Sequence, residues 1–206
     1  MQNFQGKTAF ITGAGSGIGL GMARTFARQG MNVVLCDIRR EGLEQALGEI
    51  NRLGAQALAV EADVSIKEQL ERAAQQAFDA FGKVHAVVAI SEALELDLEG
   101  SNIGLSILAP AAVRTGIFHS GRARPQRMGG AFQRVESEQF AHRLDEGLAP
   151  DVVGERVLRG IRKGEFYIFT HNWARELVSE RHERIQAAFD ECEKWYEERG
   201  MEPPPR

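Results

Sequence analysis

The sequence of 206 residues predicts an α/β protein with a doubly wound, largely parallel sheet in a single domain. Two observations favour this fold. Short apolar or β-branched runs alternate with amphipathic helical patterns through the first half of the chain, as they do in βαβ units. In addition, a glycine-rich turn at residues 12–19 directly follows the first apolar run and precedes a helical pattern.

The first half of the chain is expected to contain three strand–helix pairs and a fourth strand. Gly30 and Gly54 follow the first two helices, where a left-handed glycine ends a helix. Ser65, with Glu68 three residues later, predicts a capping box at the start of the third helix. We expect strands at Thr8–Thr12, Asn32–Asp37, Gln56–Glu61 and Lys83–Ile90, and helices at Ile18–Gln29, Arg40–Leu53 and Ile66–Phe81.

The pattern of the chain changes after the fourth strand. The apolar run ending at Ile90 passes directly into a helical pattern, Ser91–Gly100, with no turn-forming residue between Val84 and Ser91. The run itself fits either the end of a strand or the start of that helix. Because such connections have about two to six residues, usually including Gly, Asn, Asp or Pro, a central segment is expected to be missing at about residues 84–90.

The rest of the chain again shows strand and helix patterns. We expect strands at 104–109 and 165–170, a loop at Gly116–Glu136, and helices at Ser137–Leu144, Asp151–Arg162 and Trp173–Arg199. The last helix is amphipathic, and the side chains placed to pack against the core are Leu177, Ile185, Ala188, Cys192 and Trp195.

Composition and charge limit the classes of function. Hydrophobic residues make up 43% of the chain and charged residues 26%, as in ordinary globular proteins, and the formal net charge of -4 argues against a nucleic-acid or membrane-surface role. The sequence has neither a signal-peptide pattern nor an apolar run of about 20 residues, so we expect a cytoplasmic protein. Cys36 and Cys192 show no metal-ligand spacing, and no metal site is predicted.

The glycine-rich turn suits the diphosphate of a dinucleotide, which indicates a Rossmann-type sheet. Backbone amides at a helix start and the helix dipole favour an anion, and glycine lets phosphate approach the backbone. The glycines could serve the turn and helix packing alone, but their order after a strand favours phosphate binding. The residues expected to contact the dinucleotide here are Gly13, Ser16, Gly17, Ile18 and Gly19.

Four motifs together carry a resemblance to a known family. They are Thr12-Gly13-x-x-x-Gly17-Ile18-Gly19, Asp37 at the end of the second strand, Ala62-Asp63-Val64, and Pro110-Ala111-Ala112-Val113-Arg114-Thr115 with Ala111 in place of a glycine. They resemble the short-chain dehydrogenase/reductases, enzymes that move a hydride between a nicotinamide and an alcohol or carbonyl carbon. The resemblance extends from about Lys7 to Thr170.

The resemblance implies roles for residues outside the turn. Asp37 follows the turn by about 18 residues, with Ile38 beside it, and its carboxylate suits ribose hydroxyls because it can accept two O–H donors. By resemblance, Asp63 and the Val64 backbone meet the adenine, and Pro110, Val113 and Thr115 belong to the motif that flanks the nicotinamide. The simpler alternatives are that Asp37 closes a strand, Asp63 forms a turn and Thr115 lies on the surface.

The catalytic residues of the family are missing from this sequence. Members of the family carry a Tyr four residues before a Lys, and the Lys ammonium lowers the pKa of the Tyr phenol. They also carry a Ser that polarises the carbonyl and an Asn-Asn-Ala-Gly stretch that supports the cofactor. Tyr167 and Tyr196 are followed four residues later by His171 and Gly200, so no catalytic residue is assigned. Helix 91–100 resembles the second half of the helix that bears the Tyr and Lys.

Two explanations of the missing segment remain open. Either the polypeptide contains the segment and is an NAD(P)-dependent oxidoreductase, or it truly lacks it and is a non-catalytic dinucleotide-binding or interaction protein. A true loss would expose core on both faces of a buried parallel sheet, which favours the first explanation. An intact mass well above 22.7 kDa would support it.

Cofactor and partners can also be predicted. NAD is favoured over NADP because Asp37 would repel a 2′-phosphate and because Ser16 stands where NADP-preferring relatives have a basic residue, although Arg39 and Arg40 follow closely. Residues 115–148 are expected to form a mobile lid over a small alcohol or ketone. The family implies a dimer or homotetramer formed through helix 91–100 and the C-terminal helix; alternatively, both helices simply cover the core.

Overall fold

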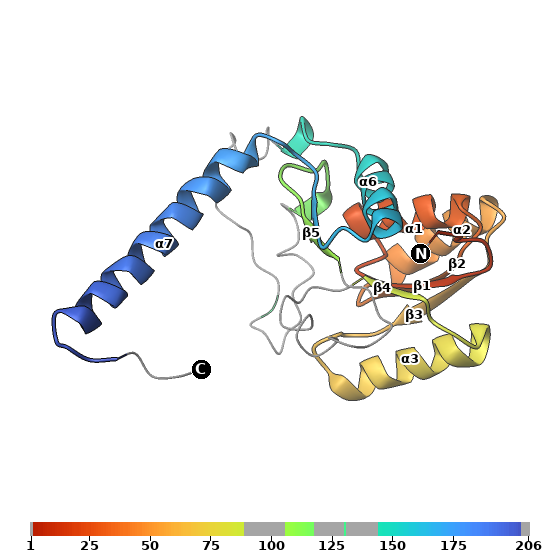
Figure 1. Ribbon diagram of the computed structural model, residues 1–206. Coiled ribbons are helices and arrows are strands. Elements are labelled where there is room, and N and C mark those ends of the chain that lie inside the picture. Colours follow the sequence, from red (N-terminus) through yellow and green to blue (C-terminus); the bar gives the residue numbers. More distant parts are fainter. Residues whose placement is uncertain (1, 89–105, 118–129, 131–143, 203–206) are drawn as a thin grey trace. The chain divides into compact units, whose positions relative to one another are not determined.

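The computed structural model of the chain describes residues 2–88, 106–117, 130 and 144–202 (Figure 1). These residues belong to two units, Met1–Thr170 and His171–Arg206. The first unit contains all the described strands and the helices that pack on them, and the second contains helix α7 (Ala174–Glu197). The doubly wound α/β fold therefore lies in the first unit.

Four parallel strands form the main sheet. Their order is β3-β2-β1-β4, with β1 at Thr8–Thr12, β2 at Asn32–Asp37, β3 at Ala57–Glu61 and β4 at Ala86–Val88. In this register, Phe10 lies between Val34 on one side and Val87 on the other. The chain builds outward from β1 to β3 and then returns to the other side of β1, so β1 and β4 form the switch point. Ligands of doubly wound sheets bind at the carboxyl ends of the strands at this point.

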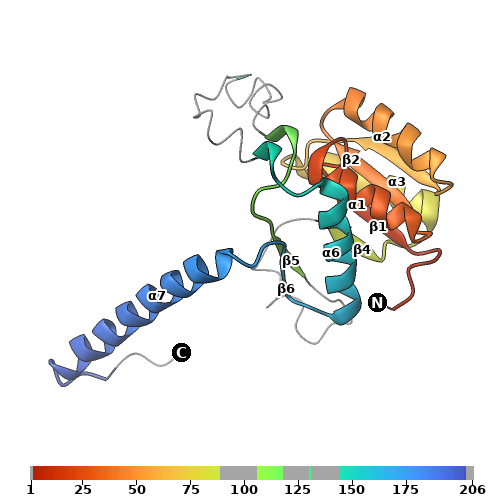
Figure 2. The same ribbon diagram turned by 90° about the horizontal axis from the view of Figure 1, so that it is seen from above.

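Helices cover both faces of this sheet. Helices α1 (Gly17–Arg28) and α2 (Arg40–Arg52) lie on one face and α3 (Lys67–Phe81) on the other (Figures 1 and 2). Because successive strand residues point to opposite faces, Val33 and Leu35 join the cluster under α1 and α2, whereas Val34 and Cys36 pack with residues of α3. This two-sided burial explains why the first two strands read as continuous apolar runs.

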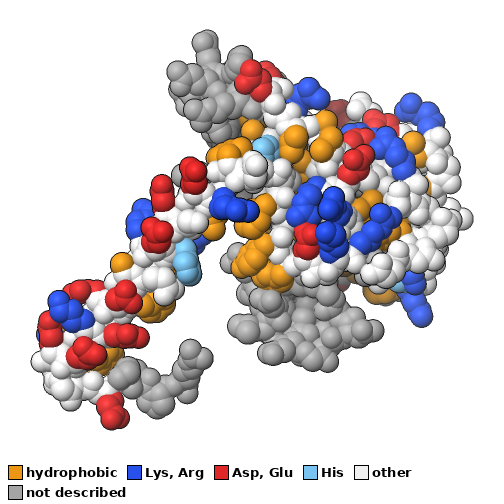
Figure 3. All heavy atoms as spheres, turned by 45° about the horizontal axis from the view of Figure 1, so that its top comes forward, with side chains coloured by type: hydrophobic (Ala, Val, Ile, Leu, Met, Phe, Trp, Pro, Cys, Tyr) orange, Lys and Arg blue, Asp and Glu red, His pale blue; other side chains and the backbone are white. Residues whose placement is uncertain are grey.

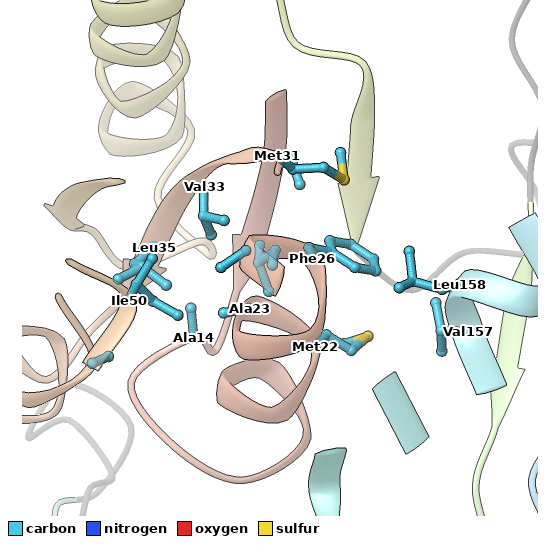
Figure 4. Packing of buried hydrophobic residues seen from close by; sticks show 14 of the residues in the cluster. Ala14, Met22, Ala23, Phe26, Met31, Val33, Leu35, Ile50, Val157 and Leu158 are labelled. Atoms are coloured by element: carbon cyan, nitrogen blue, oxygen red, sulfur yellow. The ribbon is translucent and has the colours of Figure 1, made fainter. Parts of the chain in front are cut away.

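Helix α6 (Pro150–Lys163) packs against α1. Figure 4 shows Met22 and Phe26 of α1 pointing toward Val157 and Leu158 of α6. All four side chains are buried, and Phe26 has no exposed surface. Burial of such a side chain contributes about 1.5–3 kcal/mol, so this contact joins an early and a late part of the chain firmly.

The last two described strands form a sheet of their own. Strand β5 (Ile107–Ala109) pairs in parallel with β6 (Tyr167–Phe169), and neither pairs with a strand of the main sheet among the described residues. A doubly wound sheet continues past β4 with a further strand, and every parallel connection needs a crossover of a dozen or more residues. Residues 89–106 are too few for two crossovers and a strand. This short connection is consistent with the missing central segment that the sequence predicts.

The predicted elements otherwise agree with the described ones within one to three residues at most ends, with one clear error. Helix α3 begins at Lys67 with Ile66 as N-cap and has no side-chain cap, so the predicted capping box of Ser65 and Glu68 is wrong. The Ser65 N–H and hydroxyl instead donate to Asp63 Oδ1, at 3.0 and 2.7 Å. These bonds hold Ser65 in a turn with Asp63, and the helix begins one residue later than the capping box requires.

Several predictions concern residues outside the described part of the chain. These are helix 91–100, almost all of the helix predicted at 137–144, and residues 118–129 and 131–143 of the predicted lid.

Helix α7 agrees with the predicted bounds, Trp173–Arg199, within two residues at each end. Ile185 and Trp195 are 41% and 43% exposed on this helix, and Cys192 is also exposed. Along α7, charged side chains of both signs surround scattered apolar ones (Figure 3). No helix among the described residues has the length and apolar character needed to cross a membrane.

Candidate dinucleotide-binding site

The glycine-rich turn lies between the end of β1 and the start of α1. Gly13 and Gly17 have φ of +65° and +56°, a backbone region that favours glycine. A Cβ on Gly19 would lie 2.3 Å from the Gly13 carbonyl oxygen, so this position also requires glycine. Ser16 is the N-cap residue but makes no side-chain cap hydrogen bond. The turn therefore has the closely approachable backbone and helix amino terminus that bind phosphate.

Asp37 joins the end of β2 to this turn. Its carboxylate is buried and accepts hydrogen bonds from the Gly15 N–H at 2.9 Å and the Arg39 N–H at 3.0 Å. The Ala14 N–H also donates to the Cys36 carbonyl at 3.1 Å. Because a carboxylate has about four acceptor positions, two remain for other donors after these bonds.

Cys36, next to Asp37, is a structural thiol. Burial raises the pKa of the thiol to about 11, and the Asp37 charge adds to the shift. A thiol of this pKa is not ionised near neutral pH, and the ionised form is the reactive one. Cys36 therefore belongs to the core between β2 and α3 rather than to the chemistry of the site.

Arg39 places a cation beside the same carboxylate. Its guanidinium donates to the Ser16 hydroxyl at 2.7 Å, and its Nε lies 3.9 Å from Asp37 Oδ1. Arg40 instead points along α2 to Glu44, at 3.1 Å. Of the two arginines that follow Asp37, only Arg39 thus reaches the glycine-rich turn, and the sequence alone gave no signal that separates them.

The residues predicted to meet the adenine lie at the ends of the neighbouring strands. The Ala62 N–H donates to the Asp37 carbonyl at 3.0 Å, which places Asp63 next to the end of β2. Ile38 and Val64 are 40% and 52% exposed, as expected for groups that contact a ligand or solvent. Asp63 also orders its own turn, because its side chain accepts hydrogen bonds from Ser65.

The segment after β5 returns to the turn. Pro110 is exposed at the end of the strand, and Val113 is buried and bridges to Leu148. A Cβ built on Gly17 would lie 3.3 Å from Cβ and Cγ2 of Thr115. The structure therefore brings Thr115 to the glycine-rich turn, although almost a hundred residues separate them along the chain. The supporting role of Leu148 had no signal in the sequence.

The residues predicted to contact the cofactor, where the structure describes them, therefore lie in the glycine-rich turn or just after the carboxyl ends of β2, β3 and β5. Asp37 contacts the turn at Gly15 and Thr115 approaches it at Gly17, and Asp63 follows the neighbouring strand β3. Among the described residues, no group of three or more His, Cys, Asp or Glu side chains could hold a metal ion.

Comparison with known proteins identifies relatives of both parts of the chain. The sequence model of a family described as short chain dehydrogenase matches residues 7–89. A crystal structure of a short-chain dehydrogenase/reductase from Burkholderia phymatum in complex with NAD is 26% identical and covers 91% of this chain and 97% of its own, with a TM-score of 0.82. The strands on both sides of the missing segment are therefore parts of one known fold.

Sequence relatives also match this chain either along most of its length with an unmatched stretch, or over its first part alone. A C alpha-dehydrogenase from Sphingobium sp. is 24% identical over 270 positions and covers 92% of this chain and 88% of its own length. Those 270 positions exceed the 206 residues of this chain by 64, so at least 64 of them have no counterpart here. The 7alpha-hydroxysteroid dehydrogenase of Escherichia coli K12 is 42% identical over 83 residues, and the chain spans about a third of that relative, 32%.

Proposed function

This chain belongs to the short-chain dehydrogenase/reductase family, and on that premise we propose that it binds NAD(H) for hydride transfer to or from an alcohol or ketone carbon. The observation that carries the proposal is the buried Asp37 carboxylate, hydrogen-bonded to Gly15 of the glycine-rich turn. A carboxylate, an open helix start and a glycine turn in one place fit the ribose and diphosphate of a dinucleotide.

The residues of the turn would hold the diphosphate. Gly13 and Gly19 leave the backbone uncovered, and the first N–H groups of α1 would donate to phosphate oxygens. The two acceptor positions left on Asp37 would take the ribose hydroxyls. Val113 and Thr115 would border the nicotinamide, which supplies the hydride chemistry when it is bound.

The preference for NAD over NADP rests on charge. A 2′-phosphate would meet the Asp37 carboxylate, whose charge is buried and hydrogen-bonded on both oxygens. Arg39 opposes this effect because its guanidinium lies near the same ribose position. Since Arg39 is already paired with Ser16 and lies next to Asp37, we expect it to reduce the preference without reversing it.

The chemical step requires groups that this sequence does not contain. No Tyr precedes a Lys by four residues anywhere in the 206 residues. That observation favours a second candidate, a dinucleotide-binding protein without turnover. Intact mass distinguishes the two: a mass well above 22.7 kDa supports the oxidoreductase, and a mass equal to it supports the binding protein.

Titration of Asp37→Ala with NADH and NADPH tests the cofactor site. Loss of two charge-assisted hydrogen bonds should weaken NADH binding by about 1–3 kcal/mol. The difference in affinity between NADH and NADPH should therefore become smaller. Asp79→Ala, on the exposed face of α3, is the control and should leave both affinities unchanged. Tighter binding of NADPH than of NADH by the unaltered chain would contradict the assignment.

Substrate, assembly and location complete the proposal. We propose a small-molecule alcohol or ketone as substrate, with residues 115–148 as its lid, and a cytoplasmic homo-oligomer, either a dimer or a homotetramer. The cyclohexanol dehydrogenase of Acinetobacter sp., 42% identical over 82 residues, is among the relatives. Light scattering at micromolar concentration should give the mass of an oligomer, and a monomer there would refute the assembly.

A further inference from the structure

The two halves of the candidate site come from two sheets that share no hydrogen bond among the described strands. The turn and Asp37 belong to the four-stranded sheet, whereas Thr115 follows β5 of the two-stranded sheet. In a continuous doubly wound sheet, the strands themselves would align such halves. In this chain another contact must do so.

The contact between α1 and α6 is unusually close. A Cβ on Gly21 of α1 would lie 2.4 Å from the backbone of Pro150, at the start of α6. A Cβ on Gly154 would lie 2.6 Å from the Thr25 hydroxyl. Further along, Met22 and Phe26 meet Val157 and Leu158 (Figure 4). Because two glycines let the helices approach, small displacements of α6 on α1 are sterically restricted.

An ion-pair cluster holds the first turn of α6 in the same place. Asp151 accepts hydrogen bonds from Arg24, whose Nε lies 2.7 Å from Oδ1, and from Arg28 at 2.9 Å. Burial alone would raise the pKa of Asp151, but the two arginines outweigh burial and lower it. Arg24 also binds Glu49 of α2, at 3.0 Å. Both arginines lie on α1, which begins at the glycine-rich turn.

The residues just before α6 hold the Thr115 segment. The Leu148 N–H donates to the Ala112 carbonyl at 3.1 Å, and the Arg114 N–H donates to the Leu148 carbonyl at 2.9 Å. A Cβ on Gly147 would lie 2.7 Å from the Ala112 backbone. Asp151 follows Leu148 by three residues, so the path from Arg24 to Thr115 is short and made of direct contacts.

We propose that Asp151 is a positioning residue for the nicotinamide end of the cofactor. By fixing the start of α6 on α1, it sets the place of Leu148, and through Leu148 the place of Thr115 against the turn. This inference rests on the proposed function for its consequence in binding, but the positioning itself does not depend on a ligand. Glu49 shares Arg24 yet lies on α2, within the first half of the site, and has no such effect.

Binding of two ligands to Asp151→Asn and to its matched control Glu49→Gln tests the proposal. On the proposed function, ADP-ribose would contact only the turn and Asp37, whereas NADH would also contact Thr115. Asp151→Asn should weaken NADH binding roughly 2- to 5-fold, the most that a partly exposed ion pair can contribute, and leave ADP-ribose binding unchanged. Glu49→Gln should change neither, and Asp151→Glu should recover most of the NADH affinity. Equal losses for the two ligands, or no loss for NADH, would overturn the proposal.

Hydrogen exchange of the ligand-free protein gives an independent readout. Asp151→Asn should speed exchange of the Arg114 and Leu148 amides, while amides of β1 and β2 keep their protection. Glu49→Gln should leave all of them unchanged, which excludes a general loss of stability. Unchanged exchange at both amides would refute the positioning role. If the unaltered chain binds neither ligand, the proposed function fails, and exchange still decides the role of Asp151. If Asp151→Asn does not fold, Arg28→Gln replaces it with the same expected pattern.

Discussion

Residues 2–88 and residues 106–170 differ in how completely their strands are buried. Every residue of β1 from Thr8 to Ile11 and of β2 from Val33 to Asp37 is buried. In contrast, all three residues of β5 are only partly buried, and only Ile168 is buried in β6. Helices on both faces complete the first region, whereas the second region depends on α6 and its contact with α1.

This difference divides the candidate site. The turn and Asp37 are held by contacts within residues 2–88, so the part of the site for the diphosphate and ribose does not depend on residues 106–170 for its position. Thr115 is held by a bridge to the segment before α6 and by contact with Gly17. We therefore expect the ribose and diphosphate end to withstand changes that displace the nicotinamide end.

Matched truncations of buried isoleucines test the difference most strongly. Ile11→Ala should lower the free energy of unfolding by about 3–5 kcal/mol, because its surroundings are packed on all sides and cannot collapse. Ile168→Ala should cost about 2 kcal/mol, because the exposed Tyr167 and Phe169 flank it and the site can relax. Urea unfolding followed by circular dichroism measures both, and equal losses would contradict the comparison.

The glycine-rich turn should be sensitive to a single methyl group. Gly19→Ala places a Cβ against the Gly13 carbonyl, and we expect a loss of about 2–3 kcal/mol in stability together with loss of NADH binding. Gly48→Ala in α2 is the control, because nothing lies within 4 Å of its Cβ. That variant should be stabilised by about 0.5–1 kcal/mol, and a similar gain in Gly19→Ala would refute the close approach.

Thiol reactivity reports whether the core of residues 2–88 stays inaccessible to solvent. Cys36 has a pKa raised to about 11 by burial, so its thiolate at pH 8 is roughly 100-fold scarcer than for an ordinary thiol. Cys192 is exposed on α7. A thiol reagent should therefore modify one thiol per native chain quickly and the second only in denaturant. Fast modification of both in native buffer would show that β2 opens readily.

Local patterns explain what the sequence could predict. The first two strands, the turn and α1 follow from apolar periodicity and glycine spacing, and Asp37 from its place at the end of an apolar run. The predicted capping box was wrong because the helix begins one residue later, with Ile66 as its N-cap, while Ser65 belongs to a turn with Asp63. Contacts such as Thr115 with Gly17 depend on how two sheets meet, which no local pattern encodes.

The ion pairs of Asp151 should add a small, pH-dependent term to stability. Asp151 has a lowered pKa in the folded chain, so its contribution is present above its ordinary pKa of 3.8 and is lost as pH falls through the folded value. Both partners are partly exposed, which limits the contribution to about 0.5–1 kcal/mol. Asp151→Asn should thus be less stable than the unaltered chain by this amount at pH 7, and the difference should shrink as pH falls below 3.8. Urea unfolding at pH 7, 5 and 3 measures the difference. A difference of the same size at pH 3 would mean that Asp151→Asn weakens the contact between α6 and α1 through packing, without help from charge.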